Sequence, residues 1–276
     1  MSIKTLFAAA LLLGSTISAY AADPVAAPAS KPAVDGFNGK LSFGGLYESA
    51  NGDNGYFYAD SSFSMPLGER FGAQVDTALA INGDVTAGGV GAHVFWRDPS
   101  FGLFGGYGEI VYSSSGSPSV YRFGAEAEAY IDRFSVEAFA GVQDADTIKP
   151  VFTGDLTLAY YPVDDLRLSA GIVRNFDETF GVVGLEYGFQ NSGTTQPVLF
   201  ANAEFGEDTT TVKAGLRLYF GQSSKSLIQR HREDDPRSRI QFGGLAPVSS
   251  LPDLPDDKDP DVDPGCGGIE QPPCPS

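Results

Sequence analysis

The sequence has few of the residues from which most enzyme and metal sites are built. Its 276 residues include only two histidines and two cysteines, which excludes histidine metal clusters and most catalytic triads. We therefore predict no catalytic residue, no metal site and no cofactor. Basic residues are also scarce, because 18 Lys and Arg stand against 35 Asp and Glu for a net charge of −17. This charge argues against nucleic acid as a partner.

Long apolar runs are equally rare. The run "LFAAALLLG" from Leu6 follows Lys4 and precedes "AYA" at 19–21, a pattern typical of a secretory signal peptide. We predict a cleavable signal peptide over 1–21 and a periplasmic linker over 22–38. Beyond residue 22 no apolar run reaches the ~20 residues that a transmembrane helix needs. An exported chain of this kind either stays soluble or enters a membrane as a closed β-barrel.

Polar and apolar residues alternate along many segments of the sequence. In "VYRFGAEAEAYI" (120–131), Arg122, Glu126 and Glu128 share one face and apolar side chains fill the other, which predicts a β-strand. Most such segments are close to the ~9 to 11 residues of a membrane-crossing strand, and their number is even, as in bacterial single-chain barrels. Twelve segments have this pattern: 39–49, 55–66, 70–81, 85–97, 101–113, 119–131, 134–144, 151–162, 166–175, 179–189, 197–206 and 210–220.

The connections between these segments alternate in kind. Tight turns such as "PLGER" and "RDPS" alternate with mostly longer polar or acidic loops such as "ESANGDNG" and "SSSGSPS", and only "QNSGTTQP" is long where a tight turn is expected. Short periplasmic turns and longer extracellular loops are typical of outer-membrane barrels. An even number of strands then leaves both ends of the barrel on the periplasmic side.

The two faces of the segments predict two environments. The apolar face carries Leu41, Phe43, Tyr47, Phe71, Val75, Leu79, Val90, Val94, Trp96, Leu156, Leu158, Tyr160, Leu185, Tyr187, Phe189, Val212, Leu216, Leu218 and Phe220. The other face carries Lys40, Glu48, Asp60, Asp76, Glu109, Arg122, Glu126, Glu128, Glu137, Asp155, Arg167, Glu186, Glu204, Lys213 and Arg217. So many charges in a dry core would be costly, whereas a wet lumen or the solvent face of a secreted β-sandwich accepts them. The nearly unbroken apolar face favours the barrel over the sandwich.

With these features the chain resembles small porin-like outer-membrane β-barrel proteins of Gram-negative bacteria. The resemblance rests on "AYA", on the twelve segments over 39–220, and on the closing strand "TVKAGLRLYF", which is similar to the strand that the barrel-assembly machinery recognises. It implies an all-β, antiparallel up-and-down transmembrane barrel over 39–221 in the outer membrane. The barrel-assembly machinery, outer-membrane lipid and lipopolysaccharide are its expected partners.

Counting outward from each hairpin centre predicts the partners of individual charges. The count places Glu204 opposite Lys213 and Glu109 opposite Arg122 as ion pairs. It also places two pairs of like charges across strands, Asp60 with Asp76 and Glu128 with Glu137. Because such pairs are unfavourable unless water, a cation or a raised pKa relieves them, they suggest a wet wall that attracts cations. The alternative is that arginines neutralise the carboxylates and fill the lumen.

The C-terminal part is organised differently. Residues 222–276 begin with the mixed-charge stretch "SSKSLIQRHREDDPRSR" and continue rich in Pro and Asp, a composition typical of disorder. We expect a mobile periplasmic tail that barrel insertion does not need. Three roles are open for it: a periplasmic tether, a contact with peptidoglycan or a periplasmic partner, or none. In an oxidising periplasm Cys266 and Cys274 are expected to form a disulfide.

Three functions fit this sequence, in descending order. The first is a narrow porin-like channel for ions or small solutes with an acidic lumen. The second is a closed structural or surface-interaction barrel without conductance. An outer-membrane enzyme ranks third, because the predicted outer face offers Ser61 but no strand histidine, and His93 lies on the inward face.

Overall fold

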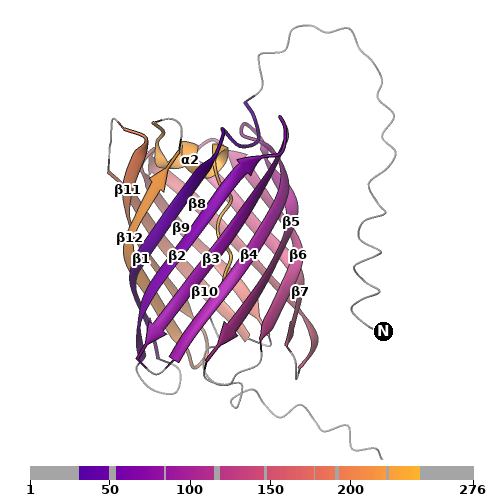
Figure 1. The fold of residues 1–276 in the computed structure, drawn as a ribbon, viewed down its shortest axis with the longest axis vertical. Coiled ribbons are helices and arrows are strands. Elements are labelled where there is room, and N and C mark those ends of the chain that lie inside the picture. Colours follow the sequence, from indigo (N-terminus) through magenta and orange to yellow (C-terminus); the bar gives the residue numbers. More distant parts are fainter. Residues whose placement is uncertain are drawn as a thin grey trace, which may run out of the picture. The chain divides into compact units, whose positions relative to one another are not determined.

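The computed structural model describes residues 31–49, 54–83, 85–114, 119–145, 148–176, 178–189, 193–221 and 224–242. Twelve antiparallel strands close into one barrel, as expected (Figure 1). They are β1 (Asn38–Glu48), β2 (Asn54–Pro66), β3 (Phe71–Asn82), β4 (Val85–Asp98), β5 (Gly102–Ser113), β6 (Val120–Ile131), β7 (Phe134–Ala145), β8 (Ile148–Val163), β9 (Leu166–Asn175), β10 (Glu178–Gly188), β11 (Thr195–Phe205) and β12 (Thr210–Phe220). No helix in the described ranges is long and apolar enough to cross a membrane.

Pairing of the first strand with the last closes the barrel. β1 and β12 pair from Gly39 opposite Phe220 to Glu48 opposite Thr211, so the sheet has no open edge, as a barrel in lipid requires. Gly44 lies opposite Gly215 in this seam. A Cβ atom at Gly44 would lie 2.0 Å from the carbonyl oxygen of Ala214, so the close approach of the two backbones requires glycine there.

The two faces of the sheet have opposite polarity. Large apolar side chains lie exposed on the outside, among them Leu41, Phe43, Tyr47, Phe71, Val75, Val90, Val94, Leu156, Leu158, Tyr160, Leu185, Tyr187, Phe189 and Val212. The inward face is polar and largely buried. This polarity is the reverse of a soluble barrel and is what a bilayer outside and a polar lumen inside would produce.

Two strands begin clearly earlier than the sequence indicates. β8 begins at Ile148 rather than at 151, so only residues 146 and 147 connect it to β7. β11 begins at Thr195 rather than at 197, which also shortens the connection after β10. The expected contrast between short turns on one rim and longer loops on the other is therefore weak.

The end of the predicted linker packs into the barrel. Ala33 and Val34 are buried, and Val34 contacts the cluster of Phe95 and Leu103. Arg97 donates a hydrogen bond to the carbonyl oxygen of Ala33 at 3.3 Å. The rest of the linker and the predicted signal peptide, residues 1–30, lie outside the described residues.

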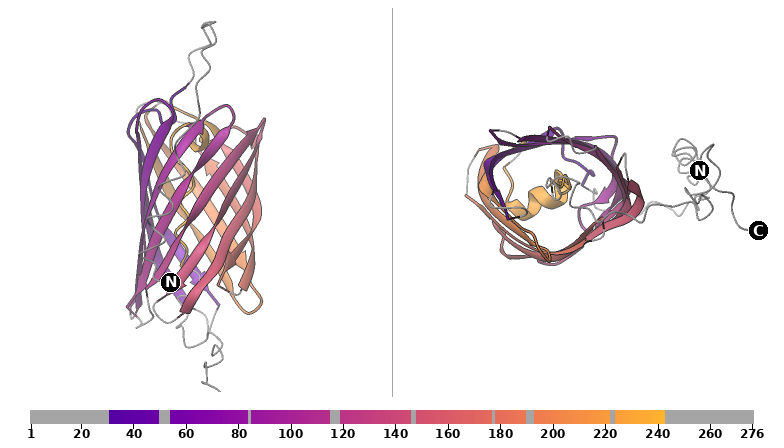
Figure 2. Two further views of the ribbon diagram at one scale, coloured as in Figure 1. Left: turned by 90° about the vertical axis from the view of Figure 1, so that its right-hand side faces the viewer. Right: turned by 90° about the horizontal axis from the view of Figure 1, so that it is seen from below.

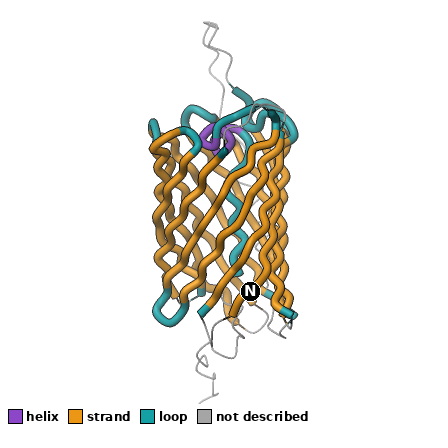
Figure 3. Tube along the Cα trace, turned by 90° about the vertical axis from the view of Figure 1, so that its left-hand side faces the viewer, coloured by secondary structure: helices purple, strands orange, loops and turns teal. Residues whose placement is uncertain are grey.

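The expectation of a disordered tail from residue 222 is wrong for residues 224–242. Helix α2 (Leu227–Glu233) lies at the rim where the barrel begins and ends, and residues 234–242 follow it through the interior. Figure 2 shows both parts inside the ring of strands, and Figure 3 shows the extended part running along the lumen. We call residues 224–242 the luminal segment. Cys266 and Cys274 lie beyond it, outside the described residues.

The polarity of the outer face generates a first prediction. Val90, near the middle of β4, points outward and is 48% exposed. We expect Val90→Arg to lower the free energy of unfolding in lipid vesicles by about 2–4 kcal/mol, because a charge at the bilayer midplane is costly. The matched change Leu67→Arg, in the connection after β2, should cost about 0–1 kcal/mol. Equal losses in denaturant titrations would contradict a bilayer around the strands.

Candidate functional site

The candidate site is the lumen together with the segment that occupies it. Helix α2 is held at the rim by the turn between β8 and β9. The backbone N–H of Leu227 donates to Asp165 Oδ1 at 2.9 Å, and the Leu227 side chain is buried against Val198 and Tyr219. Arg230 donates to Gln196 Oε1 at 3.0 Å. Seven residues form a marginal helix alone, so these contacts stabilise it.

His231 joins the helix to two strands. Its Nδ1 lies 2.8 Å from the hydroxyl of Tyr161, and its Nε2 lies 2.8 Å from the hydroxyl of Tyr219. A neutral imidazole satisfies both contacts, because one ring nitrogen donates and the other accepts. Burial lowers the pKa of His231 to about 4, although Glu186 at 3.7 Å acts in the opposite direction. The histidine is therefore neutral where it lies.

The first extended residues bind the wall near the same rim. Asp235 forms an ion pair with Lys40 of β1, and both side chains are buried. The carbonyl oxygen of Pro236 accepts hydrogen bonds from Gln74 at 3.1 Å and from Lys40 at 3.3 Å. Further along, Arg237 donates to Thr157 Oγ1 at 2.9 Å.

Arg239 is buried inside the barrel, and its guanidinium group donates four hydrogen bonds to the wall. Its Nη1 donates to both carboxylate oxygens of Asp155 at 2.6 and 2.7 Å, and its Nε donates to Glu126 at 3.2 Å. Its Nη2 donates to the carbonyl oxygen of Ala138 at 3.1 Å. Arg122 in turn donates to the carbonyl oxygen of Arg239. The segment thus supplies cationic partners for acidic residues of the wall.

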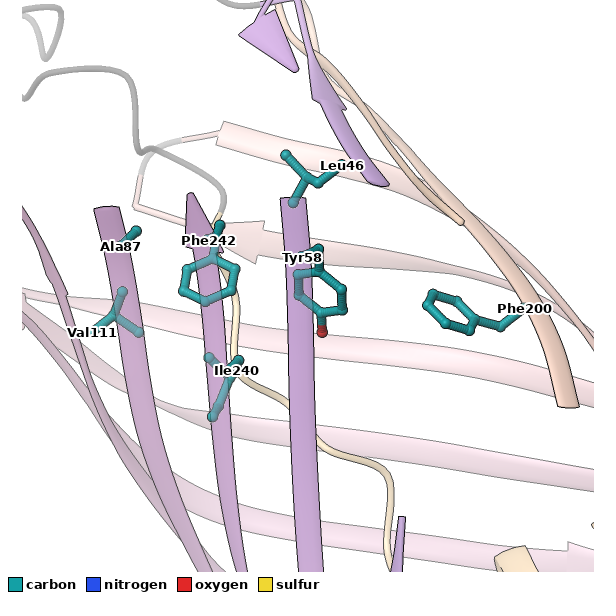
Figure 4. Packing of buried hydrophobic residues seen from close by; sticks show 9 residues of the cluster. Leu46, Tyr58, Ala87, Val111, Phe200, Ile240 and Phe242 are labelled. Atoms are coloured by element: carbon teal, nitrogen blue, oxygen red, sulfur yellow. The ribbon is translucent and has the colours of Figure 1, made fainter. Parts of the chain in front are cut away.

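Apolar packing ends the described segment at the opposite rim. Ile240 and Phe242 join a buried cluster with Leu46, Tyr58, Ala78, Ala80, Ala87, Val111 and Phe200 (Figure 4). The rings of Phe242 and Tyr58 meet edge to face with centroids 6.2 Å apart. A Cβ atom at Gly89 would lie 2.7 Å from Ile240 Cγ2, so a glycine in β4 makes room for the segment.

The structure places most of the predicted lumen charges, namely Lys40, Glu48, Asp60, Asp76, Glu109, Arg122, Glu126, Glu128, Glu137, Asp155, Arg167 and Glu186, on the buried inward face. Glu204, Lys213 and Arg217 are half-buried. Arginines of the wall also bind carboxylates, since Glu186 lies 3.2 Å from Arg167 and 2.7 Å from Arg217. The alternative of neutralisation by arginine therefore occurs at these carboxylates, and the luminal segment adds to it.

Two of the four predicted cross-strand pairs are present. Glu109 lies opposite Arg122, with a separation of 3.0 Å between their charged atoms. Glu128 lies opposite Glu137. The repulsion in this second pair is relieved locally, because Arg167 donates to Glu137 at 2.8 Å and Tyr130 donates to Glu128 at 2.7 Å.

The other two predicted pairs are wrong. Glu204 lies opposite Thr211 and Lys213 opposite Asn202, while Asp60 lies opposite Ala78 and Asp76 opposite Ser62. In both hairpins the true centre is one residue away from the predicted one. Such a displacement changes every partner by two positions but leaves each side chain on its face, which explains why the faces agree and these pairs do not.

His93 is held between two carboxylates of the wall. Its Nε2 lies 2.9 Å from Asp76 and its Nδ1 lies 2.8 Å from Glu126. The sequence indicated an inward histidine but not these partners, because they come from β3 and β6 and depend on the register. In the described part of the chain no group of three or more His, Cys, Asp or Glu could hold a metal ion.

A polar cavity of about 100 Å³ remains beside the luminal segment. Its lining includes Asp60, Glu137, Arg167, Glu186, Lys213, Arg217 and His231. One water needs about 10–15 Å³ of such space, so the cavity has room for several waters. The occupied lumen is therefore partly hydrated rather than dry.

Comparison with known proteins identifies the architecture. No protein-family model and no curated protein sequence matches the chain. The structure is similar to KdgM porin, solved alone and in complex with disordered oligogalacturonate, with a TM-score of 0.50 in both cases and sequence identities of 13% and 12%. Each match covers 67% of this chain and 99% of the porin.

The outer membrane phospholipase of Salmonella typhi, a dimer with bound calcium, matches with a TM-score of 0.46 and 15% identity over 72% of this chain and 94% of the phospholipase. At such identities these likenesses concern the fold alone.

The contacts of Arg239 generate a second prediction. Arg239→Gln removes the guanidinium group that binds Asp155, and it leaves Glu126 with its contact to His93 alone. Breaking a buried ion pair by removing one partner typically costs about 3–5 kcal/mol. We expect faster amide hydrogen exchange over residues 234–242 in this variant. In the control Arg237→Gln, exchange should change little, because the Arg237 side chain is 35% exposed and lies 3.7 Å from Glu137. Similar exchange in both variants would contradict a central role for Arg239.

The position of His231 generates a third prediction. The docked histidine has a pKa of about 4, against 6.5 in solvent, so its contribution to docking is complete above pH 6.5 and is lost as the pH falls toward 4. Asp234 has the opposite effect on docking. Burial raises its pKa to about 6, so the docked segment becomes more stable as the pH falls below 6 and this carboxyl group takes up a proton.

The variant His231→Gln separates the two effects. Lowering the pH from 7 to 5 should weaken docking less in this variant than in the unmodified protein, as measured by hydrogen exchange over residues 234–242. The same pH dependence in both proteins would show that His231 does not contribute to it.

Proposed function

We propose that this chain is a porin-like outer-membrane channel for ions or small solutes whose lumen is closed by its own residues 224–242. The observation that carries the proposal is that a separate, non-strand segment fills the lumen, while the wall side chains alone do not. The closed barrel, the exposed apolar outer face and the fold shared with a porin support the placement in the outer membrane.

The charges of the wall favour a lumen that is wet when the segment leaves. Removing Arg239 from the lumen would leave Asp155 and Glu126 without the hydrogen bonds that this arginine donates. Buried carboxylates without partners are costly, but hydrated ones are not. The segment itself has five basic and three acidic residues, so its departure makes the lumen more negative. An open pore of this kind attracts cations.

A closed structural barrel is the second candidate. It is favoured by the buried cluster around Ile240 and Phe242, because apolar burial holds the segment independently of charge. In this alternative the luminal segment is a permanent part of the core and the barrel does not conduct.

Catalysis has less support than either candidate. On the outer face Ser61 lies 2.8 Å from the hydroxyl of Thr77, and both histidines of the chain, His93 and His231, lie inside the barrel. KdgM porin was solved with oligogalacturonate, which is a polymer of carboxylated sugars. The acidic wall does not favour such a polyanion, so we do not extend that ligand to this chain.

Conductance in planar bilayers tests the proposal. We expect few or no openings from the full protein and sustained openings from a variant lacking residues 224–276, with a reversal potential that shows cation preference. Adding Asp155→Asn and Glu126→Gln to the deletion should reduce this preference, because both carboxylates face the emptied lumen. Heat-modifiable electrophoretic mobility provides the control for folding. A deletion variant that folds but does not conduct would favour the closed structural barrel.

A further inference from the structure

We propose that the chain beyond Phe242 is displayed on the extracellular side of the outer membrane, because the luminal segment carries it through the barrel. The inference rests on the outer-membrane placement proposed above and not on conductance. It replaces the periplasmic tail expected from the sequence, and with it a contact to peptidoglycan.

The segment enters at the rim that holds both ends of the barrel. β12 ends at Phe220, which lies opposite Gly39 near the start of β1. Helix α2 binds turns at this same rim, since Ile228 donates its backbone N–H to the carbonyl oxygen of Asp164 at 3.0 Å. The chain therefore turns directly from the last strand into the lumen.

The contacts of the segment then advance along the barrel in chain order. Asp235 binds Lys40, near the start of β1, whereas Phe242 packs in one cluster with Leu46, near the end of that strand. Arg239 lies between them at Asp155. Figure 3 shows the continuous path. Nine residues reach at most about 30 Å when fully extended, so the segment is long enough to approach the ~30 Å hydrocarbon thickness of a bilayer.

The cavity beside the described segment offers little room for the chain to return. The cavity beside the segment is about 100 Å³, which holds several waters but not a second extended strand of nine residues. On this inference the chain after Phe242 continues from the rim at which Phe242 lies. That rim also carries the connection between β11 and β12, and it is opposite to the rim of the turn between β8 and β9.

The direction of membrane insertion identifies the two rims. An exported chain reaches the outer membrane from the periplasm, and an even number of strands leaves both ends of the barrel on one side. The rim with these ends is then periplasmic and the rim with Phe242 is extracellular. Residues 243–276, which include Cys266 and Cys274, follow on the extracellular side.

Thiol labelling of intact cells tests this topology. The test protein carries Cys274→Ser, so that Cys266 is its only thiol. Two controls carry Cys266→Ser and Cys274→Ser together with one new thiol, either Asp208→Cys at the β11–β12 rim or Asp164→Cys at the β8–β9 rim. With a membrane-impermeant maleimide, Cys266 should label to the same extent as the Asp208→Cys control. The Asp164→Cys control should label only after the outer membrane is permeabilised.

Labelling of Cys266 only after permeabilisation, with the Asp208→Cys control already labelled in intact cells, would overturn the inference. If the Asp208→Cys control itself required permeabilisation, the outer-membrane placement would fail instead, so the two failures are distinguishable. A second readout does not depend on thiol reactivity. Proteinase K added to intact cells should remove an epitope tag placed after Ser276, and a tag that is lost only after permeabilisation would also overturn the inference.

Discussion

Buried ion pairs between the barrel wall and residues 224–242 hold the luminal segment inside the barrel. Arg239 is the clearest case, because its guanidinium group bridges Asp155 of β8 and Glu126 of β6 while its own carbonyl oxygen accepts from Arg122. Taking such charges out of water is costly unless nearly every hydrogen bond is satisfied. The same pairs therefore give the luminal segment one position and one direction in the barrel. If the segment leaves, the carboxylates of the wall need water in its place.

The bilayer explains why the barrel could be predicted from the sequence. Lipid outside and polar groups inside impose a strict period of two on every strand, so the outward position of Val94 and the inward position of Glu126 follow from counting alone. Register is a finer property, because it depends on the centre of each turn. The pair of Glu109 and Arg122 was predicted correctly, whereas the centre of the β2–β3 hairpin was displaced by one residue and Asp76 was given the wrong partner.

The luminal segment could not be predicted by the same reasoning. Its order comes from contacts with strands far away in the sequence, such as those of Asp235 with Lys40 and of Leu227 with Val198, and composition indicates only what a segment does without such contacts. One signal was present in the sequence. The arginines at 230, 232, 237 and 239 cluster in a chain that is otherwise acidic, and they complement a wall with an excess of carboxylates.

The central claim is that the luminal segment crosses the barrel from one rim to the other. Distance measurement between spin labels tests it most directly, with Gln241→Cys on the segment paired in turn with Asp208→Cys and with Asp164→Cys, after both native cysteines are replaced by serine. Passage through the lumen predicts narrow distance distributions, with label 241 closer to label 208 than to label 164. A broad distribution, or a shorter distance to label 164, would contradict it.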